Sequence, residues 1–399
     1  MREVKLPDGV EGYCDERFAP VADVLAKQLA SDEHHGVAFA ARFRGEPVVD
    51  LWGGKRNTPD GEAPWQRDTM TICFSTTKGV AATALHMAME RAGLSYDTPV
   101  AKVWPEFGAS GKDTITIAHL LTHQAGVPQI REEIDSSDDL ADWDAMVRVM
   151  EGLTPMWEPG TANGYHAINF AWLIGETLHR IDGRDVPTFL AEEIAGPLSM
   201  DGLFIGTPTS EHQRVAPLIA PPPPPGIDPD ADLASFLPKD SVTYHALSPR
   251  GNLVTFLNSP VGMSSCIPSI SGIFTARSLA TLYAALDGGG IVDGVRLLEP
   301  DTIATISTVQ TDRVDMVIPI PVRWRLGYMS GGPTSVRALG PSSDAYGHVG
   351  AGGTIAGTDP STGLAFGFVY DKWAAAEFLG GPRTQGIVDA ATACAGAAL

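Results

Sequence analysis

The sequence predicts an α/β fold in which both ends of the chain contribute strands to one sheet and a helical domain is inserted between them. Three observations lead to this prediction. Strand-like segments occur near both ends of the 399 residues, the segment from about 75 to 200 is mainly helical, and no internal repeat is present. A chain of this length exceeds the size at which one hydrophobic core keeps growing, so about two domains are expected.

The chain opens with a predicted helix followed by a hairpin. Residues 17–31 carry apolar side chains at helical spacing. Residues 36–54 predict two strands joined at Arg44 and Gly45. This part would supply the first strands of the sheet.

Helical patterns then follow one another, and glycines stop three of them. The predicted helices are 76–92, 116–124, 140–152 and 168–181, and the stops are Gly93, Gly126 and Gly183. This block predicts a helical domain over residues 71–214.

The last part of the chain returns to strands. Residues 217–260 are predicted to be loop, because five consecutive prolines cannot donate backbone hydrogen bonds; the segment is either a linker or a wall over a cleft. Further predicted elements are a helix at 275–290, strands at 323–330, 354–359 and 364–371, and a helix at 383–399. Residues 1–70 and 215–399 would therefore form a discontinuous sheet domain.

Composition excludes several classes of partner. A net charge of −20 disfavours nucleic acid and anionic membranes, which require clustered Lys and Arg. The N-terminus has no apolar segment of a signal peptide, and no run approaches the roughly 18 apolar residues of a membrane span. Four scattered cysteines without a CxxC pair argue against a zinc site or a disulfide framework. We expect a cytoplasmic protein without a membrane anchor, and its oligomeric state is unknown.

A serine and a lysine three residues apart stand where a helix is predicted to begin. Ser75 and Lys78, in STTK, share one helical face. About half an SxxK pair is expected by chance from 23 serines and 8 lysines, and a helix cap is the other explanation for Ser75. The spacing alone is therefore a weak signal.

The surroundings of the pair favour chemistry. A serine hydroxyl is a nucleophile only when a neighbouring base takes its proton. A lysine can be that base when burial lowers its pKa from about 10.4, and apolar or small residues follow Lys78 in the helix. No serine is flanked by glycine at both −2 and +2, so the GxSxG design of other serine hydrolases is absent.

Two further segments carry candidate groups. Tyr165 follows the turn-rich PGTANG, where a phenol could relay a proton or simply pack at an interface. The glycines after His348 do not complete a dinucleotide-binding motif, because Ile355 stands at its last position. They would instead let a strand edge approach a substrate with its backbone N–H groups.

Together, STTK at 75–78, Tyr165 after PGTANG, and HVG at 348–350 resemble the serine β-lactamase and penicillin-binding protein superfamily. The likeness is closest to its class C-like branch, the family VIII carboxylesterases, and covers residues 15–395. It implies a β-lactamase-like fold, with an antiparallel sheet flanked by helices, an inserted helical domain, and an active site at their interface.

The resemblance also implies roles for individual residues. Ser75 would be the acylated nucleophile, Lys78 would assist its deprotonation, and Tyr165 would be the general base that carries the proton to the leaving group. The backbone N–H groups of Ser75 and Ala351 would hold the oxyanion. His348 and Gly350 would contact substrate.

Two departures from the family pattern narrow the chemistry. Ala167 stands where β-lactamases have the asparagine of YxN, and His348, Val349 and Gly350 replace their KTG. The fixed cation that would hold a substrate carboxylate is therefore missing. An uncharged small-molecule ester fits better than a lactam antibiotic.

The resemblance thus implies an esterase for short to medium acyl chains that needs no cofactor. The alternatives are an acyltransferase of the same fold, a β-lactamase or D-amino-acid peptidase-type amidase, and a non-catalytic binding protein. His119 and His123 stand four residues apart, but Leu120 occupies the glutamate position of HExxH, so no metal site is expected. By resemblance, His123 is structural.

Overall fold

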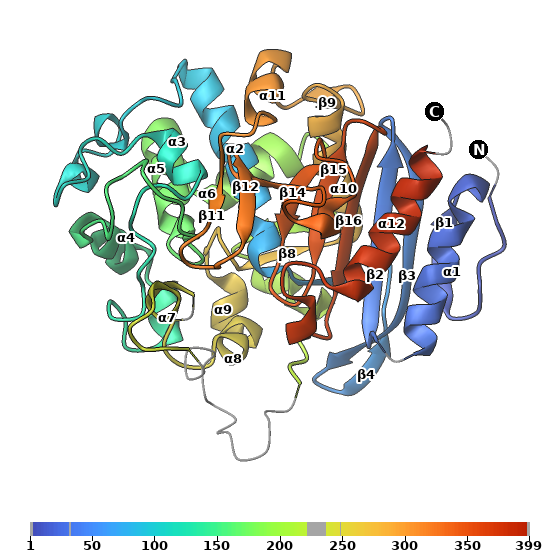
Figure 1. Cartoon of the computed structure of the whole chain (residues 1–399). Coiled ribbons are helices and arrows are strands. Elements are labelled where there is room, and N and C mark those ends of the chain that lie inside the picture. The colour runs from blue at the N-terminus through green and yellow to red at the C-terminus, as the bar shows by residue number, and fades with distance from the viewer. Residues whose placement is uncertain (1–2, 32, 222–236, 248, 397–399) are drawn as a thin grey trace.

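The two ends of the chain form one antiparallel sheet. The computed structural model describes residues 3–31, 33–221, 237–247 and 249–396. Ten strands make up this sheet (Figure 1). The N-terminal ones are β1 (Val10–Cys14), β2 (Gly36–Phe43), β3 (Glu46–Thr58) and β4 (Gly61–Pro64). The C-terminal ones are β11 (Thr311–Val314), β12 (Pro321–Arg325), β13 (Tyr328–Ser330), β14 (Tyr346–Val349), β15 (Ile355–Asp359) and β16 (Leu364–Tyr370).

The junction between the two ends lies in the middle of the sheet. The strand order is β1-β3-β2-β16-β15-β14-β13-β12-β11, with β4 paired to β3. Strand β16 pairs with β2 from Leu364 opposite Phe43 to Tyr370 opposite Val37, and every residue of β16 is buried. Apolar side chains on both faces explain this central position. The predicted sharing of one sheet is confirmed.

Helices cover the sheet on both faces. Helices α1 (Ala19–Ala30) and α12 (Pro382–Gly396) pack against each other on one face, and α10 (Ala276–Asp287) packs on β16, β2 and β15 from the other (Figure 1). A Cβ atom at Gly367 would lie 2.4 Å from the carbonyl oxygen of Ala276. Helix α10 comes this close to the sheet because position 367 has no side chain.

The inserted segment supplies a second group of helices at one side of the molecule (Figure 1). They are α2 (Thr77–Ala92), α3 (Ile117–Leu121), α4 (Trp143–Gly152), α5 (Phe170–Asp182) and α6 (Val186–Leu190). Helix α2 is buried from Thr77 to Met89 and ends at Gly93 in the left-handed conformation, as predicted. The division into a sheet domain and a helical domain stays a prediction.

A small sheet leads directly into the candidate site, and the sequence patterns did not predict it. Its order is β6-β8-β5-β7, formed by β5 (Met70–Ile72), β6 (Leu203–Ile205), β7 (Val215–Ala216) and β8 (Gly272–Phe274). Strands of two or three residues are too short to show a period of two. The remaining pair is β9 (Ile291–Val292) with β10 (Val295–Arg296), followed by α11 (Pro300–Ile306).

Three predicted elements need correction. The loop predicted for 217–260 contains α7 (Val242–Ala246) and α8 (Leu253–Asn258), and α9 (Pro260–Ser264) follows. Each of these short helices begins at a side-chain cap, from Ser241, Asn252 and Ser259, so capping rather than periodicity marks them. Of the five consecutive prolines, those from residue 222 onward lie outside the described residues. The strand predicted at 323–330 is two strands, and the helix predicted at 116–124 is only α3.

None of the helices in the described ranges is long and apolar enough to cross a membrane. The four cysteines are free thiols.

Candidate active site

Ser75 stands on a sharp turn between a strand and a helix. Strand β5 ends at Ile72, and a single helical turn, Phe74–Thr76, leads into α2. Phe74 has φ of 44°, in the left-handed region that non-glycine residues seldom adopt. Such strain is typical of functional turns. The Ser75 side chain makes no capping hydrogen bond, so the alternative explanation as a helix cap is not supported.

Lys78 is fully buried one helical turn later, and its side-chain nitrogen has three oxygen neighbours. Nζ lies 2.7 Å from the carbonyl oxygen of Ala167, 3.0 Å from that of Ser269, and 3.0 Å from Oγ of Ser75. Burial lowers the pKa of Lys78 well below 10.5. Burial therefore favours the neutral amine over the ammonium.

The three contacts fix which bond the neutral form of Lys78 accepts. A neutral amine has two N–H groups and one lone pair, and carbonyl oxygens only accept hydrogen bonds. The carbonyls of Ala167 and Ser269 take the two N–H groups. In the neutral form the lone pair is left for the Ser75 hydroxyl, which donates to Lys78, whereas an ammonium would donate to Ser75. Donation from Ser75 to Lys78 is the arrangement that a serine nucleophile and its base require.

Tyr165 closes the other side of the site. Nζ of Lys78 lies 4.8 Å from the centre of its ring. Two effects act on the pKa of the Tyr165 phenol: burial, the larger one, raises the pKa above 10, and a hydrogen bond with the Ser75 side chain lowers it. The ring stacks on Trp324 with centres 5.7 Å apart. Serine, lysine and tyrosine are thus brought together as predicted, with the phenol protonated.

The turn between β14 and β15 lies against the turn that carries Ser75. Oγ1 of Thr354 donates to the carbonyl oxygen of Cys73 at 2.9 Å, and Oγ1 of Thr76 donates to the Thr354 carbonyl at 3.0 Å. A Cβ atom at Gly350 would lie 2.3 Å from the Cys73 oxygen, so this approach requires glycine. Within the described residues, the backbone N–H of Ala351 meets no protein acceptor. It is free to bind an oxyanion.

His348 is buried beside the trio and is uncharged. Its Nδ1 lies 2.9 Å from the carbonyl oxygen of Val349, which fixes the proton on Nδ1. Nε2 is buried and finds no hydrogen-bond partner in the described part of the chain. Burial and the nearby Lys78 lower the pKa of His348 to about 3. The residue cannot replace the fixed cation of KTG.

Of the residues behind Tyr165, His123 was expected from the resemblance to be structural, and no short motif marks the others. The N–H of His166 donates to Nδ1 of His123 at 3.2 Å, and the His123 ring contacts Tyr165 edge-on at 4.9 Å. Asp315 accepts the backbone N–H of Tyr165 at 2.9 Å. Asn169 donates to the carbonyl of Val127, so it does not supply the missing YxN amide.

His119 and His123, which stand four residues apart, both accept hydrogen bonds from backbone N–H groups. Nδ1 of His119 accepts the N–H of Thr116 in the capping box of α3, while His123 accepts from His166. Across the described ranges, no group of three or more His, Cys, Asp and Glu side chains is arranged to hold a metal ion.

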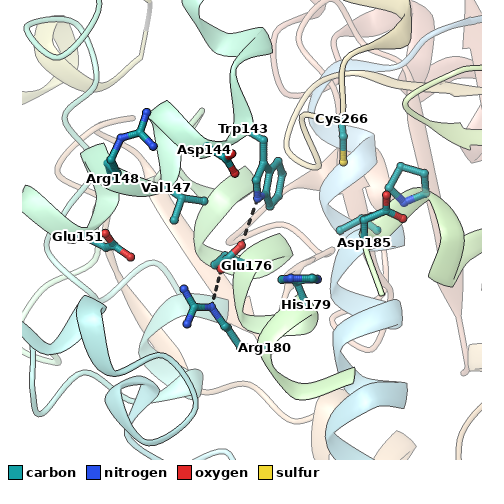
Figure 2. A pocket seen from close by; sticks show the side chains of 12 residues that line it. Trp143, Asp144, Val147, Arg148, Glu151, Glu176, His179, Arg180, Asp185 and Cys266 are labelled. Atoms are coloured by element: carbon teal, nitrogen blue, oxygen red, sulfur yellow. Dashed lines mark hydrogen bonds and ion pairs between the residues drawn. The ribbon is translucent and has the colours of Figure 1, made fainter. Parts of the chain in front are cut away.

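A cavity of about 430 Å³ lies apart from the trio, between α4, α5 and the start of α6 (Figure 2). Glu176, one of the residues that line it, accepts hydrogen bonds from Nε1 of Trp143 at 3.1 Å and Nε of Arg180 at 2.6 Å. Burial, followed by the charge of Asp185, raises the pKa of the thiol of Cys266, another lining residue. The cavity therefore offers neither a thiolate nor a nucleophile with a base.

Comparison with known proteins agrees with this geometry. The model of the Beta-lactamase family matches residues 21–385. The chain is 33% identical over 369 residues to the esterase/beta-lactamase LipL of Mycobacterium tuberculosis (strain ATCC 25618 / H37Rv), covering 91% of this chain and 83% of that protein.

Solved structures are similar over nearly the whole chain. A family VIII carboxylesterase is 32% identical with a TM-score of 0.85, and a penicillin-binding protein homolog from Caulobacter crescentus is 36% identical with a TM-score of 0.84. Each comparison covers 96% of this chain and 99% of the other. The resemblance and fold class predicted from the sequence are confirmed, and the chain belongs to the beta-lactamase family.

Proposed function

We propose that the protein is a serine hydrolase that cleaves uncharged carboxylic esters through an acyl-enzyme on Ser75. The observation that carries the proposal is the set of three contacts at Nζ of Lys78, which leaves its lone pair for the Ser75 hydroxyl. Similarity to an esterase/beta-lactamase and to a family VIII carboxylesterase supports the same reaction class.

In the first step, Oγ of Ser75 attacks the ester carbonyl carbon while its proton passes to Lys78. The carbonyl oxygen becomes an oxyanion, held by the backbone N–H groups of Ser75 and Ala351. One such donor typically contributes about 10²- to 10³-fold in rate. The free N–H of Ala351 supports this role.

In the second step, the C–O bond to the alcohol breaks and the alcohol leaves with a proton. We assign this proton to Tyr165, because burial keeps the phenol protonated, and Lys78 restores it. This differs from the expectation that Tyr165 is the general base, which the direction of its pKa does not favour. Water then attacks the acyl carbon and releases the carboxylic acid.

Preference for uncharged esters follows from the electrostatics of the site. His348 is neutral, because its pKa is lowered to about 3, so no cation replaces that of KTG. A buried carboxylate without a partner is costly. Substrates that carry a carboxylate next to the scissile bond should bind poorly.

The test is turnover of p-nitrophenyl butyrate by wild type and Ser75→Ala. We expect wild type to form one acyl adduct at Ser75, seen by intact-protein mass spectrometry, and Ser75→Ala to lose at least about 10⁴-fold in rate. Ser278→Ala is the control, because Ser278 is also buried and donates one hydrogen bond, to the Asp201 carbonyl. It should keep wild-type turnover.

Two results would contradict the proposal. If Ser75→Ala kept the wild-type rate, Ser75 would not be the nucleophile. Product formation only when an alcohol or amine acceptor is added, with negligible hydrolysis, would make the protein an acyltransferase.

A further inference from the structure

A single carboxylate turns inward from the exposed hairpin that joins β11 to β12. Asp315 is fully buried, whereas its neighbours Val314 and Met316 are 63% and 44% exposed. This reverses the usual distribution, in which the acid faces water and the apolar side chains are covered. The stability of a surface loop does not explain why the acidic side chain is buried while its apolar neighbours are exposed.

The carboxylate binds three backbone N–H groups. Oδ1 of Asp315 accepts from Val317 at 2.9 Å and from Ile318 at 3.0 Å, which shapes the hairpin itself. The third bond, at 2.9 Å, crosses 150 residues to the N–H of Tyr165. Next to it, the Met316 N–H donates to the Asn163 carbonyl at 2.8 Å. The hairpin is thus tied to the loop that carries the phenol.

Backbone N–H groups take the place of a cation at Asp315. Among the described residues, Asp315 forms no ion pair, and its Oδ2 has no hydrogen-bond partner. The indole N–H of Trp324 lies near enough to favour the carboxylate without reaching hydrogen-bond geometry. Burial raises the pKa of the Asp315 carboxyl, and the hydrogen bonds from Ile318, Tyr165 and Val317 oppose that rise. The bond to Tyr165 therefore stabilises the carboxylate as well as the loop.

Tyr165 depends on this hairpin for its position. It lies in the connection between α4 and α5, which has no helix or strand of its own. Asp315 holds its backbone, and Trp324 of β12 stacks on its ring with an interplanar angle of 16°. Both contacts come from one hairpin, so the backbone and the ring of Tyr165 are fixed together.

The charged and titratable groups around Tyr165 can be named from each side. Lys78 lies over the ring from α2, His123 contacts it from the loop after α3, and His348 stacks near it from β14. His166, the next residue in the chain, stacks on His123. Burial lowers the pKa of these four groups and raises that of Asp315, the acidic group among these neighbours.

We propose that Asp315 is a positioning residue of the reaction: together with Trp324 of the same hairpin, it fixes the phenol of Tyr165 against Ser75 for proton transfer to the leaving alcohol. The inference rests on the proposed function. It adds a residue from a hairpin that carries none of the three motifs.

The test compares Asp315→Asn with Asp315→Ala in the turnover of p-nitrophenyl butyrate, with kcat and KM measured separately. The amide oxygen of asparagine can still accept the three N–H bonds. We therefore expect Asp315→Asn to keep kcat and KM close to those of wild type. Asp315→Ala loses the acceptor, and we expect kcat to fall about 10- to 100-fold with a smaller change in KM.

Asp359→Ala is the matched control. Asp359 is also buried, accepts from the N–H and hydroxyl of Ser361 in a turn, and has an Oδ2 without a partner among the described residues, but it lies at the far end of β15. A general effect of removing a buried carboxylate would appear at both positions. We expect Asp359→Ala to keep the kcat and KM of wild type.

The outcomes separate this inference from the proposed function. Wild-type kcat in Asp315→Ala overturns the proposal. A loss of kcat in Asp315→Asn as large as that in Asp315→Ala also overturns it, because the retained acceptor should rescue the rate. Should Asp315→Ala fail to fold, Asp315→Ser replaces it, because its shorter side chain cannot serve all three N–H groups, and wild-type kcat in that variant overturns the proposal. A wild-type protein that neither turns over the ester nor forms an adduct at Ser75 defeats the proposed function itself.

Discussion

Two buried lysines show what distinguishes a candidate base from a structural amine. Lys78 and Lys112 are both fully buried, and each donates to two backbone carbonyls, Lys112 to those of Glu151 and Leu153. Burial lowers both pKa values, that of Lys112 to about 8, where the charge of Glu151 partly offsets the burial. The difference lies in the third direction around the nitrogen. At Lys78 a serine hydroxyl occupies it, 3.0 Å away.

Burial alone therefore does not make a lysine catalytic. Two carbonyls satisfy the N–H groups in both places, and both amines can lose their proton more easily than a lysine in water. Only the amine beside Ser75 has a proton donor to accept from. Experiments that remove each amine or change its protonation test this comparison.

The largest expected effect comes from replacing the two lysines by methionine. Lys78→Met removes the base and should lower kcat/KM for p-nitrophenyl butyrate by about 10²- to 10⁴-fold. Lys112→Met should leave kcat/KM within about twofold of wild type, because it touches no group of the candidate site. Melting curves recorded alongside show whether each variant is folded.

A loss of activity of similar size in both variants, with both folded, would show that the site responds to general disruption. The assignment of Lys78 as the base would then have to be abandoned.

Much of the candidate site could be predicted, because its chemistry lies in short motifs. Ser75 and Lys78 occupy one helical turn, so their contact follows from helix geometry. Tyr165 required the family resemblance, since 90 residues separate it from Ser75 and no local period connects them. The antiparallel sheet shared by the two ends followed from the strand patterns and the resemblance together.

The remaining features depend on contacts that leave no local pattern. Neither the polar, loop-like sequence around Lys112 nor the mainly apolar sequence around Asp315 shows that these side chains are buried, and only the tertiary fold does. The left-handed backbone at Phe74 has no residue preference that would reveal it. The small sheet that contains β5, the strand before Ser75, consists of strands too short to show periodicity.

A second expected effect is the pH dependence of catalysis. The amine of Lys78 accepts the Ser75 proton only when unprotonated, and burial lowers its pKa well below 10.5. We expect kcat/KM to rise with pH on the acid side and to reach a plateau before about pH 9, more than a unit below the ordinary pKa of lysine. The measurement is hydrolysis of an ester whose leaving group is detected at all pH values.

A rate that still rises tenfold per pH unit near pH 10 would mean that the base has an ordinary lysine pKa. Lys78 would then be charged at neutral pH, donating to Ser75 instead of accepting from it.

The smallest expected effect concerns the stability contributed by Lys112. Its pKa is about 8 in the folded chain and 10.5 without burial. Between these values the unfolded chain binds the proton and the folded chain does not, so a rise in pH favours the folded state. We therefore expect the free energy of unfolding of wild type, relative to Lys112→Met, to increase from about pH 8 to about pH 10.5, by at most about 1.4 kcal/mol per pH unit.

Urea unfolding of the two proteins at several pH values measures this difference, and Lys102→Met controls for loss of one positive charge at the surface. The difference isolates the residue, because carboxylates and other lysines contribute equally to both proteins unless they contact position 112. A difference that stays flat would mean that Lys112 keeps its proton inside the protein, held by Glu151. Burial would then favour the neutral amine at Lys78 but not at Lys112.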